Sequence, residues 1–303
     1  MEHRMRLLFL GSGEFGLPTL QKLVGSHDVC AVISATDRPA GRNQKVTPTS
    51  ISAWASQNEI EVLPTENVNS LEMIGKIDSF EVDAMVVIAF GQKLSEDVIG
   101  NRFAINLHAS LLPRWRGASP INAAILHGDT ESGVSVITLS QRMDGGGVLA
   151  QKATPIGDSE TAGELHDRLS MLGTDLVLDV LAGDNTSIDQ DETLVTYAPK
   201  ISRADAILDL QQDAEVVART IRGFSPWPGC HLQIANIDCK LLNAVASDGS
   251  GNPGEILEDG SIAVGLGSVV ITQLQPAGSK PMSWKDFCNG RSVNAGDQCE
   301  VRS

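Results

Sequence analysis

Residues Arg6–Val24 read RLLFLGSGEFGLPTLQKLV, and the order of patterns in this stretch indicates the architecture of the first part of the chain. A short apolar run predicts a buried strand, three glycines predict a turn, and the spacing of the later apolar residues predicts an amphipathic helix. A strand, a turn and a helix in this order form the first half of a βαβ unit. The stretch therefore predicts an α/β fold with a mostly parallel sheet.

The same alternation continues through the first two thirds of the chain. Further β-branched and apolar runs predict strands at Val29–Ser34, Ala84–Ala89, Phe103–Leu107 and Val134–Leu139. Amphipathic stretches predict helices at Leu17–Val24, Ile51–Asn58, Leu71–Phe80, Ile121–His127 and Ala162–Leu181.

The last third of the chain has a different character. Residues 183–206 are polar and have no lasting periodicity, which is typical of a linker. A short helix predicted at Ala214–Ile221 is followed by short strands separated by glycine turns, for which a small closed β-barrel is the natural solution. We expect a first domain over 1–186, a linker over 187–206 and a smaller barrel domain over 207–303.

Composition places the chain among globular proteins. No apolar run reaches the roughly 18 residues that cross a bilayer, and the apolar N-terminal run stops at a glycine, so we expect a cytosolic protein without a membrane span. The five cysteines form no CxxC pair and lie near no histidine cluster. We therefore expect reduced thiols, without disulfides and without a metal site.

A formal net charge of −15 argues against a nucleic-acid partner, because binding to phosphates depends on lysine and arginine. Three windows nevertheless contain arginine and no Asp or Glu: 38–58, 98–128 and 216–237. If they meet in space, they form a locally positive face on an acidic protein. The alternative is that this distribution is a chance feature.

The glycine turn Gly11–Gly16 matches the GxGxxG spacing of dinucleotide-binding proteins, between a predicted strand and a predicted helix. That motif also needs an acidic residue at the end of the next strand, near Ser34, and none is there. We therefore favour a tight turn over an NAD site. Its backbone N–H groups either face an anion or only allow the chain to bend.

The strongest candidate for chemistry lies at the end of the strand Phe103–Leu107. Asn106 and His108 are two positions apart, so their side chains share one face of the strand. An amide donor beside an imidazole suits the stabilisation of an oxyanion and a proton transfer, although the pair alone is also compatible with a structural role. Asp144, in a glycine-rich turn after the next strand, offers a carboxylate or a simple turn cap.

Asn106 and His108, followed by SLLPRWRGASPI and then by Asp144 in its glycine turn, resemble the active-site signature of the 10-formyltetrahydrofolate-dependent formyltransferases. The segments DRPAGR, DETLVTYAPKI, FSPWPG and LQPAGSKPMSW extend this resemblance over essentially the whole chain. The first glycine loop and the Asp144-Gly145-Gly146 turn depart from the usual family sequences.

The resemblance implies a Rossmann-like first domain and a second domain with an oligonucleotide-fold barrel. It implies that Asn106, His108 and Asp144 are catalytic, and that 10-formyltetrahydrofolate is the formyl donor, with no metal and no covalent enzyme intermediate. The predicted folate-binding residues are Ser110, Leu111, Leu112, Pro113, Ile88, Ala89, Phe90 and Gly91.

The same resemblance implies that the acceptor is the amino group of methionine on initiator tRNA. We expect a monomer, although no residue pattern in the sequence determines the oligomeric state. The predicted tRNA-binding residues are Arg38, Arg42, Lys45, Arg114 and Arg116. Formyltransferases that act on glycinamide ribonucleotide or on amino-sugar nucleotides are alternatives within the same chemistry. A folate-binding or RNA-binding module without catalysis is an alternative of another class.

Overall fold

The computed structural model describes residues 4–40, 45–183 and 186–302. The chain forms two compact units, each assembled from several segments. The N-terminal unit comprises Met1–Arg116, Gly133–Ala153 and Asp167–Thr196, and the C-terminal unit comprises Gly117–Ser132, Thr154–His166 and Tyr197–Ser303.

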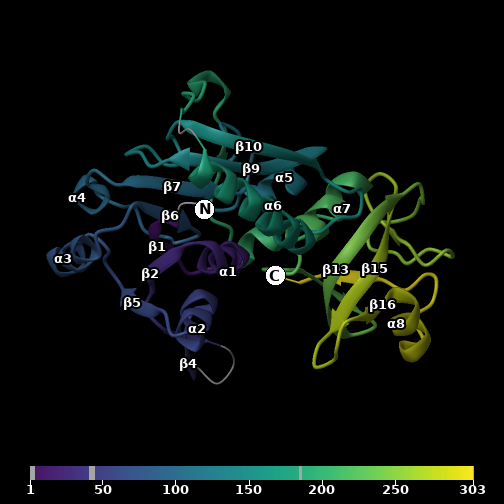
Figure 1. Ribbon diagram of the computed structural model, residues 1–303. Coiled ribbons are helices and arrows are strands. Elements are labelled where there is room, and N and C mark those ends of the chain that lie inside the picture. Colours follow the sequence, from purple (N-terminus) through teal and green to yellow (C-terminus); the bar gives the residue numbers. More distant parts are fainter. Residues whose placement is uncertain (1–3, 41–44, 184–185, 303) are drawn as a thin grey trace. The chain divides into compact units, whose positions relative to one another are not determined.

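A seven-stranded sheet with the order β10-β9-β7-β6-β1-β2-β5 forms the centre of the N-terminal unit (Figure 1). Its strands are β1 (Arg6–Gly11), β2 (Asp28–Ala35), β5 (Glu61–Thr65), β6 (Ala84–Ile88), β7 (Phe103–His108), β9 (Glu131–Thr138) and β10 (Val148–Pro155). Strands β5, β2, β1, β6 and β7 are parallel, whereas β9 runs antiparallel to β7. The predicted mostly parallel sheet is thus confirmed.

Helices cover both faces of this sheet. They are α1 (Leu17–Ser26), α2 (Ser50–Gln57), α3 (Leu71–Ser79), α4 (Glu96–Ile99) and α6 (Ala162–Ala182). On one face, Leu8 and Leu10 of β1 share a buried core with Met73 and Ile77 of α3. On the other, helices α1 and α6 are joined by a hydrogen bond between the buried hydroxyls of Thr19 and Thr174 (3.0 Å). Successive strand residues point to opposite faces, so each strand contributes side chains to the packing on both faces of the sheet.

The glycine turn after β1 is explained by close packing. A Cβ atom at Gly11 would lie 2.8 Å from the carbonyl oxygen of Ile88, and one at Gly16 would lie 3.2 Å from the Ile88 side chain. The N–H of Ser12 donates to the carbonyl oxygen of Ala89 (3.2 Å), so this donor is used within the fold. The glycines let the backbone of the turn approach β6 closely.

The C-terminal unit contains the predicted β-barrel, as a nearly closed antiparallel sheet with the order β14-β15-β13-β12-β17 and with β16 beside β15. Its strands are β12 (Cys230–Ile234), β13 (Ile237–Ser247), β14 (Ile262–Ala263), β15 (Ser268–Pro276), β16 (Met282–Ser283) and β17 (Cys299–Val301). Its helices are α5 (Pro120–Leu126), α7 (Ala214–Gly223) and α8 (Trp284–Arg291). The apolar side of α7, including Val217 and Ile221, is buried in the barrel core.

Small elements complete the chain. Two short antiparallel strands, β3 (Arg38–Ala40) and β4 (Lys45–Thr47), form a hairpin, and β8 (Arg116–Gly117) pairs with β11 (Tyr197–Ala198). Single 3₁₀ turns lie at Glu14–Gly16, Glu192–Leu194 and Arg203–Ala206. Over the described part of the chain, every helix is too short or too polar to span a bilayer.

Candidate active site

Asn106 and His108 lie next to each other on one face of β7, as their spacing predicts. Asn106 pairs with Val87 of β6 on one side and with Ile137 of β9 on the other. The Asn106 side chain is half-buried, and His108 is 7% exposed. Two polar side chains at the end of a central strand, between two neighbouring strands, are poorly explained by packing alone and indicate a functional site.

Asp144 reaches His108 by a route that the sequence does not predict. Because β9 is antiparallel to β7, its end at Thr138 lies opposite Ile105, below the level of His108. The loop over 139–147 therefore has to return along the sheet. It does so: a carboxylate oxygen of Asp144 lies 3.7 Å from Nδ1 of His108, and Asp144 has a φ of +47°. The amide, imidazole and carboxylate thus belong to one site.

The backbone fixes which nitrogen of His108 carries hydrogen. Nε2 lies 2.8 Å from the carbonyl oxygen of Trp115, which itself adopts a φ of +63°. A carbonyl oxygen only accepts hydrogen bonds, so Nε2 is the donor, and Nδ1 is the nitrogen that faces Asp144. Trp115 was not among the residues predicted for the site.

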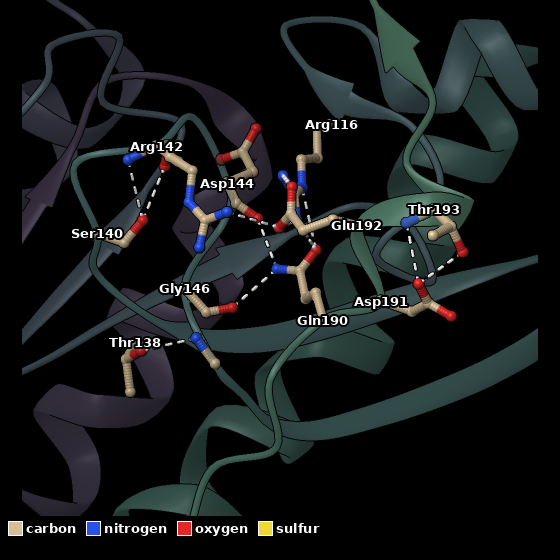
Figure 2. A network of polar contacts seen from close by, with 11 residues as sticks. Arg116, Thr138, Ser140, Arg142, Asp144, Gly146, Gln190, Asp191, Glu192 and Thr193 are labelled. Carbon is tan, nitrogen blue, oxygen red and sulfur yellow. Dashed lines mark hydrogen bonds and ion pairs between the residues drawn. The ribbon is translucent and has the colours of Figure 1, made fainter.

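A network of polar side chains holds the Asp144 loop (Figure 2). The amide nitrogen of Gln190 donates to the carbonyl oxygens of Asp144 (2.7 Å) and Gly146 (2.8 Å). Its amide oxygen accepts two hydrogen bonds from Arg116, at 3.0 and 2.8 Å. Sequence reasoning missed Gln190, because it lies in the polar segment expected to be a linker and no periodicity marks it.

Glu192 completes the network. Its carboxylate pairs with Arg116 (2.9 Å) and with Arg142 (3.1 Å). The hydrogen bond from Arg116 is the main reason that the pKa of Glu192 lies below its usual range, and the charges of Arg116 and Arg142 act in the same direction. Two cations thus hold one exposed carboxylate at the edge of the loop.

The residues predicted to bind folate divide into buried and accessible ones. Ile88, Phe90, Ser110 and Leu112 are each less than 5% exposed, and the Ser110 hydroxyl donates to the carbonyl oxygen of Arg114 (2.6 Å). Leu111 and Pro113 are half-buried, and Ala89 and Gly91 are exposed.

The residues predicted to bind tRNA differ in their surroundings. Arg42 lies outside the described residues, as do the side chains of Arg38 and Lys45. Arg114 is exposed, and its guanidinium lies 4.3 Å from the ring centroid of Trp115. Arg116 is only 1% exposed and binds Gln190 and Glu192, so it has almost no surface to offer a partner.

The acid-free windows therefore contribute fewer surface cations than their composition suggests. In the second window Arg102 pairs with Asp78 (2.6 Å), and in the third Arg222 is only 7% exposed. No group of three or more His, Cys, Asp or Glu side chains within the described ranges is arranged to hold a metal ion.

Comparison with known proteins identifies the class to which this fold and site belong. Residues 5–181 match the Formyl transferase family, and residues 200–292 match the Formyl transferase, C-terminal domain family. The chain therefore belongs to the formyl transferase family. Asn106, His108 and Asp144 all lie within the first match.

Relatives that are similar along their whole length are named methionyl-tRNA formyltransferases. A methionyl-tRNA formyltransferase of Roseobacter denitrificans is 40% identical, with 96% of this chain and 98% of the relative covered. One of Methylococcus capsulatus is 39% identical, with 95% and 98% covered.

Solved structures share the fold at lower sequence identity. HypX from Aquifex aeolicus, in complex with tetrahydrofolic acid, has a TM-score of 0.66 at 18% identity, covering 97% of this chain and 49% of that one. The sugar 3N-formyl transferase WlaRD has a TM-score of 0.64 at 18% identity, covering 92% and 100%. Methionyl-tRNA formyltransferase from Clostridium thermocellum has a TM-score of 0.55 at 12% identity, covering 81% and 95%.

Proposed function

We propose that this enzyme transfers the formyl group of 10-formyltetrahydrofolate to the amino group of methionine carried by initiator tRNA. The observation that carries the proposal is the meeting of His108 and Asp144, 3.7 Å apart, beside Asn106. The relatives named for this activity are 39–40% identical over nearly the whole chain, whereas the sugar formyltransferase WlaRD is 18% identical. Initiator tRNA is thus favoured over a sugar nucleotide as the acceptor.

Asn106 is the residue placed to stabilise developing negative charge. Formyl transfer forms a bond between the amine nitrogen and the formyl carbon, and the formyl oxygen gains charge as the amine attacks. The Asn106 amide donates to that oxygen. Removing one such donor typically lowers kcat about 10²–10³-fold.

His108 and Asp144 manage the protons. The attacking amine loses a proton, and the folate nitrogen takes one up as its bond to the formyl carbon breaks. The Asp144 carboxylate is the acceptor for the amine proton, directly or through a water. His108, anchored through Nε2 to the Trp115 carbonyl, presents Nδ1 to Asp144 and to the reacting centre.

The backbone after β6 fits the folate. Ala89 and Gly91 are exposed and have φ values of +48° and +80°, and a Cβ atom at Gly91 would meet open space. Two residues earlier, Val87 pairs with Asn106, so this turn lies beside the catalytic strand end. Exposed peptide groups offer both donors and acceptors, which the polar edge of a pterin ring requires. Leu111 and Pro113, which are half-buried, form an apolar wall.

Three arginines and one lysine contact the tRNA in this proposal. Arg38, Arg42 and Lys45 belong to the DRPAGR segment and its continuation, and Arg114 is exposed after the catalytic strand. Such side chains bind phosphates and orient the acceptor stem. We leave Arg116 out of this set because it is buried and engaged with Gln190 and Glu192.

We also propose the organisation expected from the sequence: catalysis by 1–186, a linker at 187–206, tRNA docking by 207–303, and a monomer acting in the cytoplasm. The gap between the two family matches, from 182 to 199, supports a linker in this region. The contacts of Gln190 tie the first part of that linker to the catalytic loop.

A direct assay tests the proposal. The protein is incubated with 10-formyltetrahydrofolate and either methionyl initiator tRNA or an amino-sugar nucleotide. We expect N-formylmethionyl-tRNA and no formylated sugar. Formylation of the sugar nucleotide alone would assign the enzyme to the other branch of the family. No product with either acceptor would indicate a binding module.

A further inference from the structure

We propose that Gln190 is a positioning residue for catalysis, which holds Asp144 against His108 and is itself oriented by the buried Arg116. The inference rests on the catalytic role proposed for Asp144. It assigns a function to a segment that composition describes only as polar and irregular.

Gln190 differs from its neighbours in burial. Across 186–194, all of which the structure describes, Gln190 alone is half-buried and every other residue is exposed. Its side chain makes four hydrogen bonds, two through each end of the amide. These use both donors and both lone pairs of the amide, which is the full capacity of a glutamine side chain. A residue that only links two elements does not require burial or four side-chain hydrogen bonds.

Arg116 determines the orientation of the Gln190 amide. Its Nε and Nη2 both donate to the amide oxygen, which leaves the amide nitrogen facing the catalytic loop. If the amide were reversed, its N–H groups would face the guanidinium and its oxygen would face two carbonyl oxygens. Arg116 is 1% exposed, and Glu192 binds the same guanidinium, so the anchor is itself held in place.

The two carbonyl oxygens that Gln190 binds belong to Asp144 itself and to Gly146, two residues further on in the same turn. This turn includes an unusual backbone conformation, since Asp144 has a φ of +47°. Left-handed conformations cost energy for residues other than glycine and persist where the surroundings hold them. Because the loop after β9 has to return along the sheet to reach His108, the bonds from Gln190 fasten it at the position where the carboxylate is needed.

The decisive experiment compares Gln190→Glu with Asp191→Ala in the full-length protein. A glutamate at 190 still accepts from Arg116, but its carboxylate has no hydrogen to donate to the loop carbonyls. Asp191 is the adjacent exposed residue, and its carboxylate bonds within its own turn to Thr193. We expect Gln190→Glu to lower kcat about 10- to 100-fold with an unchanged KM for methionyl-tRNA, since small misplacements of a catalytic group have effects of this size. We expect Asp191→Ala to leave both constants unchanged.

A spectroscopic readout reports the position of Asp144 without relying on turnover. The ¹⁵N shifts of the His108 ring depend on the group that faces Nδ1. We expect them to change in Gln190→Glu and in Gln190→Met, and to stay unchanged in Asp191→Ala. Unchanged ring shifts and unchanged kcat in both Gln190 variants would overturn the inference, as would a fall in kcat matched by Asp191→Ala.

The Asp144→Asn variant separates this inference from the proposed function. If Asp144→Asn is as active as the unmodified enzyme, the catalytic assignment fails, and the ring shifts still test whether Gln190 positions the loop. If Asp144→Asn is strongly impaired, Gln190→Glu should lower turnover no further in that background. Full additivity of the two effects would show that Gln190 does not act through Asp144.

Discussion

Nε2 of His108 donates to the carbonyl oxygen of Trp115 over 2.8 Å, so one side of the imidazole is anchored to the backbone and the other faces Asp144. Anchoring of this kind fixes both the tautomer and the ring orientation. The imidazole therefore has its tautomer and orientation fixed before any substrate binds.

This anchor makes it possible to test the structural role of His108 separately from the chemical role that we propose for it. His108→Gln keeps an amide N–H that can donate to the Trp115 carbonyl, whereas His108→Ala removes the donor. We expect His108→Gln to lower turnover about 10²–10⁴-fold while its free energy of unfolding stays close to that of the unmodified protein. We expect His108→Ala to be destabilised by about 1–3 kcal/mol as well. Urea unfolding and single-turnover kinetics measure the two effects, and an active His108→Gln would exclude proton transfer by this residue.

The loop that carries Asp144 has little room for added atoms. A Cβ at Gly146 would collide with the carbonyl oxygen of Thr138. We expect Gly146→Ala to displace the loop and to reduce turnover about 10-fold or more, because the Asp144 carboxylate, proposed here to be catalytic, moves with it.

Gly75→Ala is the matched control for that substitution. Gly75 lies inside α3, and a Cβ there meets nothing within 4 Å. We expect this variant to be more stable by about 0.5–1 kcal/mol, with unchanged turnover. If Gly146→Ala were equally harmless, the loop would be less constrained than its packing indicates.

Because Glu192 pairs with Arg116, we expect the stability of the folded protein to depend on pH in the acidic range. The pKa of Glu192 is lowered in the folded protein, chiefly by the hydrogen bond from Arg116, so its ionised form stabilises the fold. That contribution is complete above the unfolded pKa of about 4.3 and is lost as the pH falls through the lower, folded value. We expect Glu192→Gln to lower the urea midpoint at pH 7, and the difference to shrink below about pH 4.

The exposed Glu258, in the C-terminal unit, provides the control for this comparison. We expect Glu258→Gln to have nearly the same urea midpoint as the unmodified protein throughout the titration. A constant difference between Glu192→Gln and the unmodified protein down to pH 3 would contradict the proposed pairing.

We expect the buried cysteines to be unreactive toward thiol reagents in the folded protein. Burial raises the pKa of Cys230 and of Cys299 to about 12, and of Cys239 to about 11. At neutral pH these thiols are protonated, and the thiolate is the reactive form. In a titration with Ellman's reagent we expect the half-buried Cys30 and Cys288 to react first and the three buried thiols to react only after denaturation. A fast phase that survives replacement of both Cys30 and Cys288 by serine would show that the barrel core opens readily.

Much of the fold follows from local patterns. The expected strand at Val134–Leu139 corresponds to β9 (Glu131–Thr138), and the expected helix at Ala162–Leu181 corresponds to α6 (Ala162–Ala182). Their apolar spacing reflects burial on one or both sides, which a sequence records directly. The sharing of one strand face by Asn106 and His108 follows from the period of a strand in the same way.

Local sequence patterns do not reveal the direction of a strand or the contacts between residues far apart in the chain. Nothing in the residues of β9 indicates that it runs antiparallel to β7, so the return of the loop to His108 could not be foreseen. Arg116 has the composition of a surface cation and is nevertheless buried, because its partners come from more than 70 positions later in the chain. Gln190 is similarly defined by partners that only the folded chain brings near.

The attachment of Gln190 also bears on how this chain can be divided. A truncated fragment that stopped at residue 186 would keep Asn106, His108 and Asp144 and would discard the side chain that fastens the last of them. A fragment that continued to Thr196 would retain it, together with the hydrogen bond between the Trp115 N–H and the Thr196 hydroxyl. Gene fusions and domain exchanges within this family would accordingly do better to place their junction after Thr196.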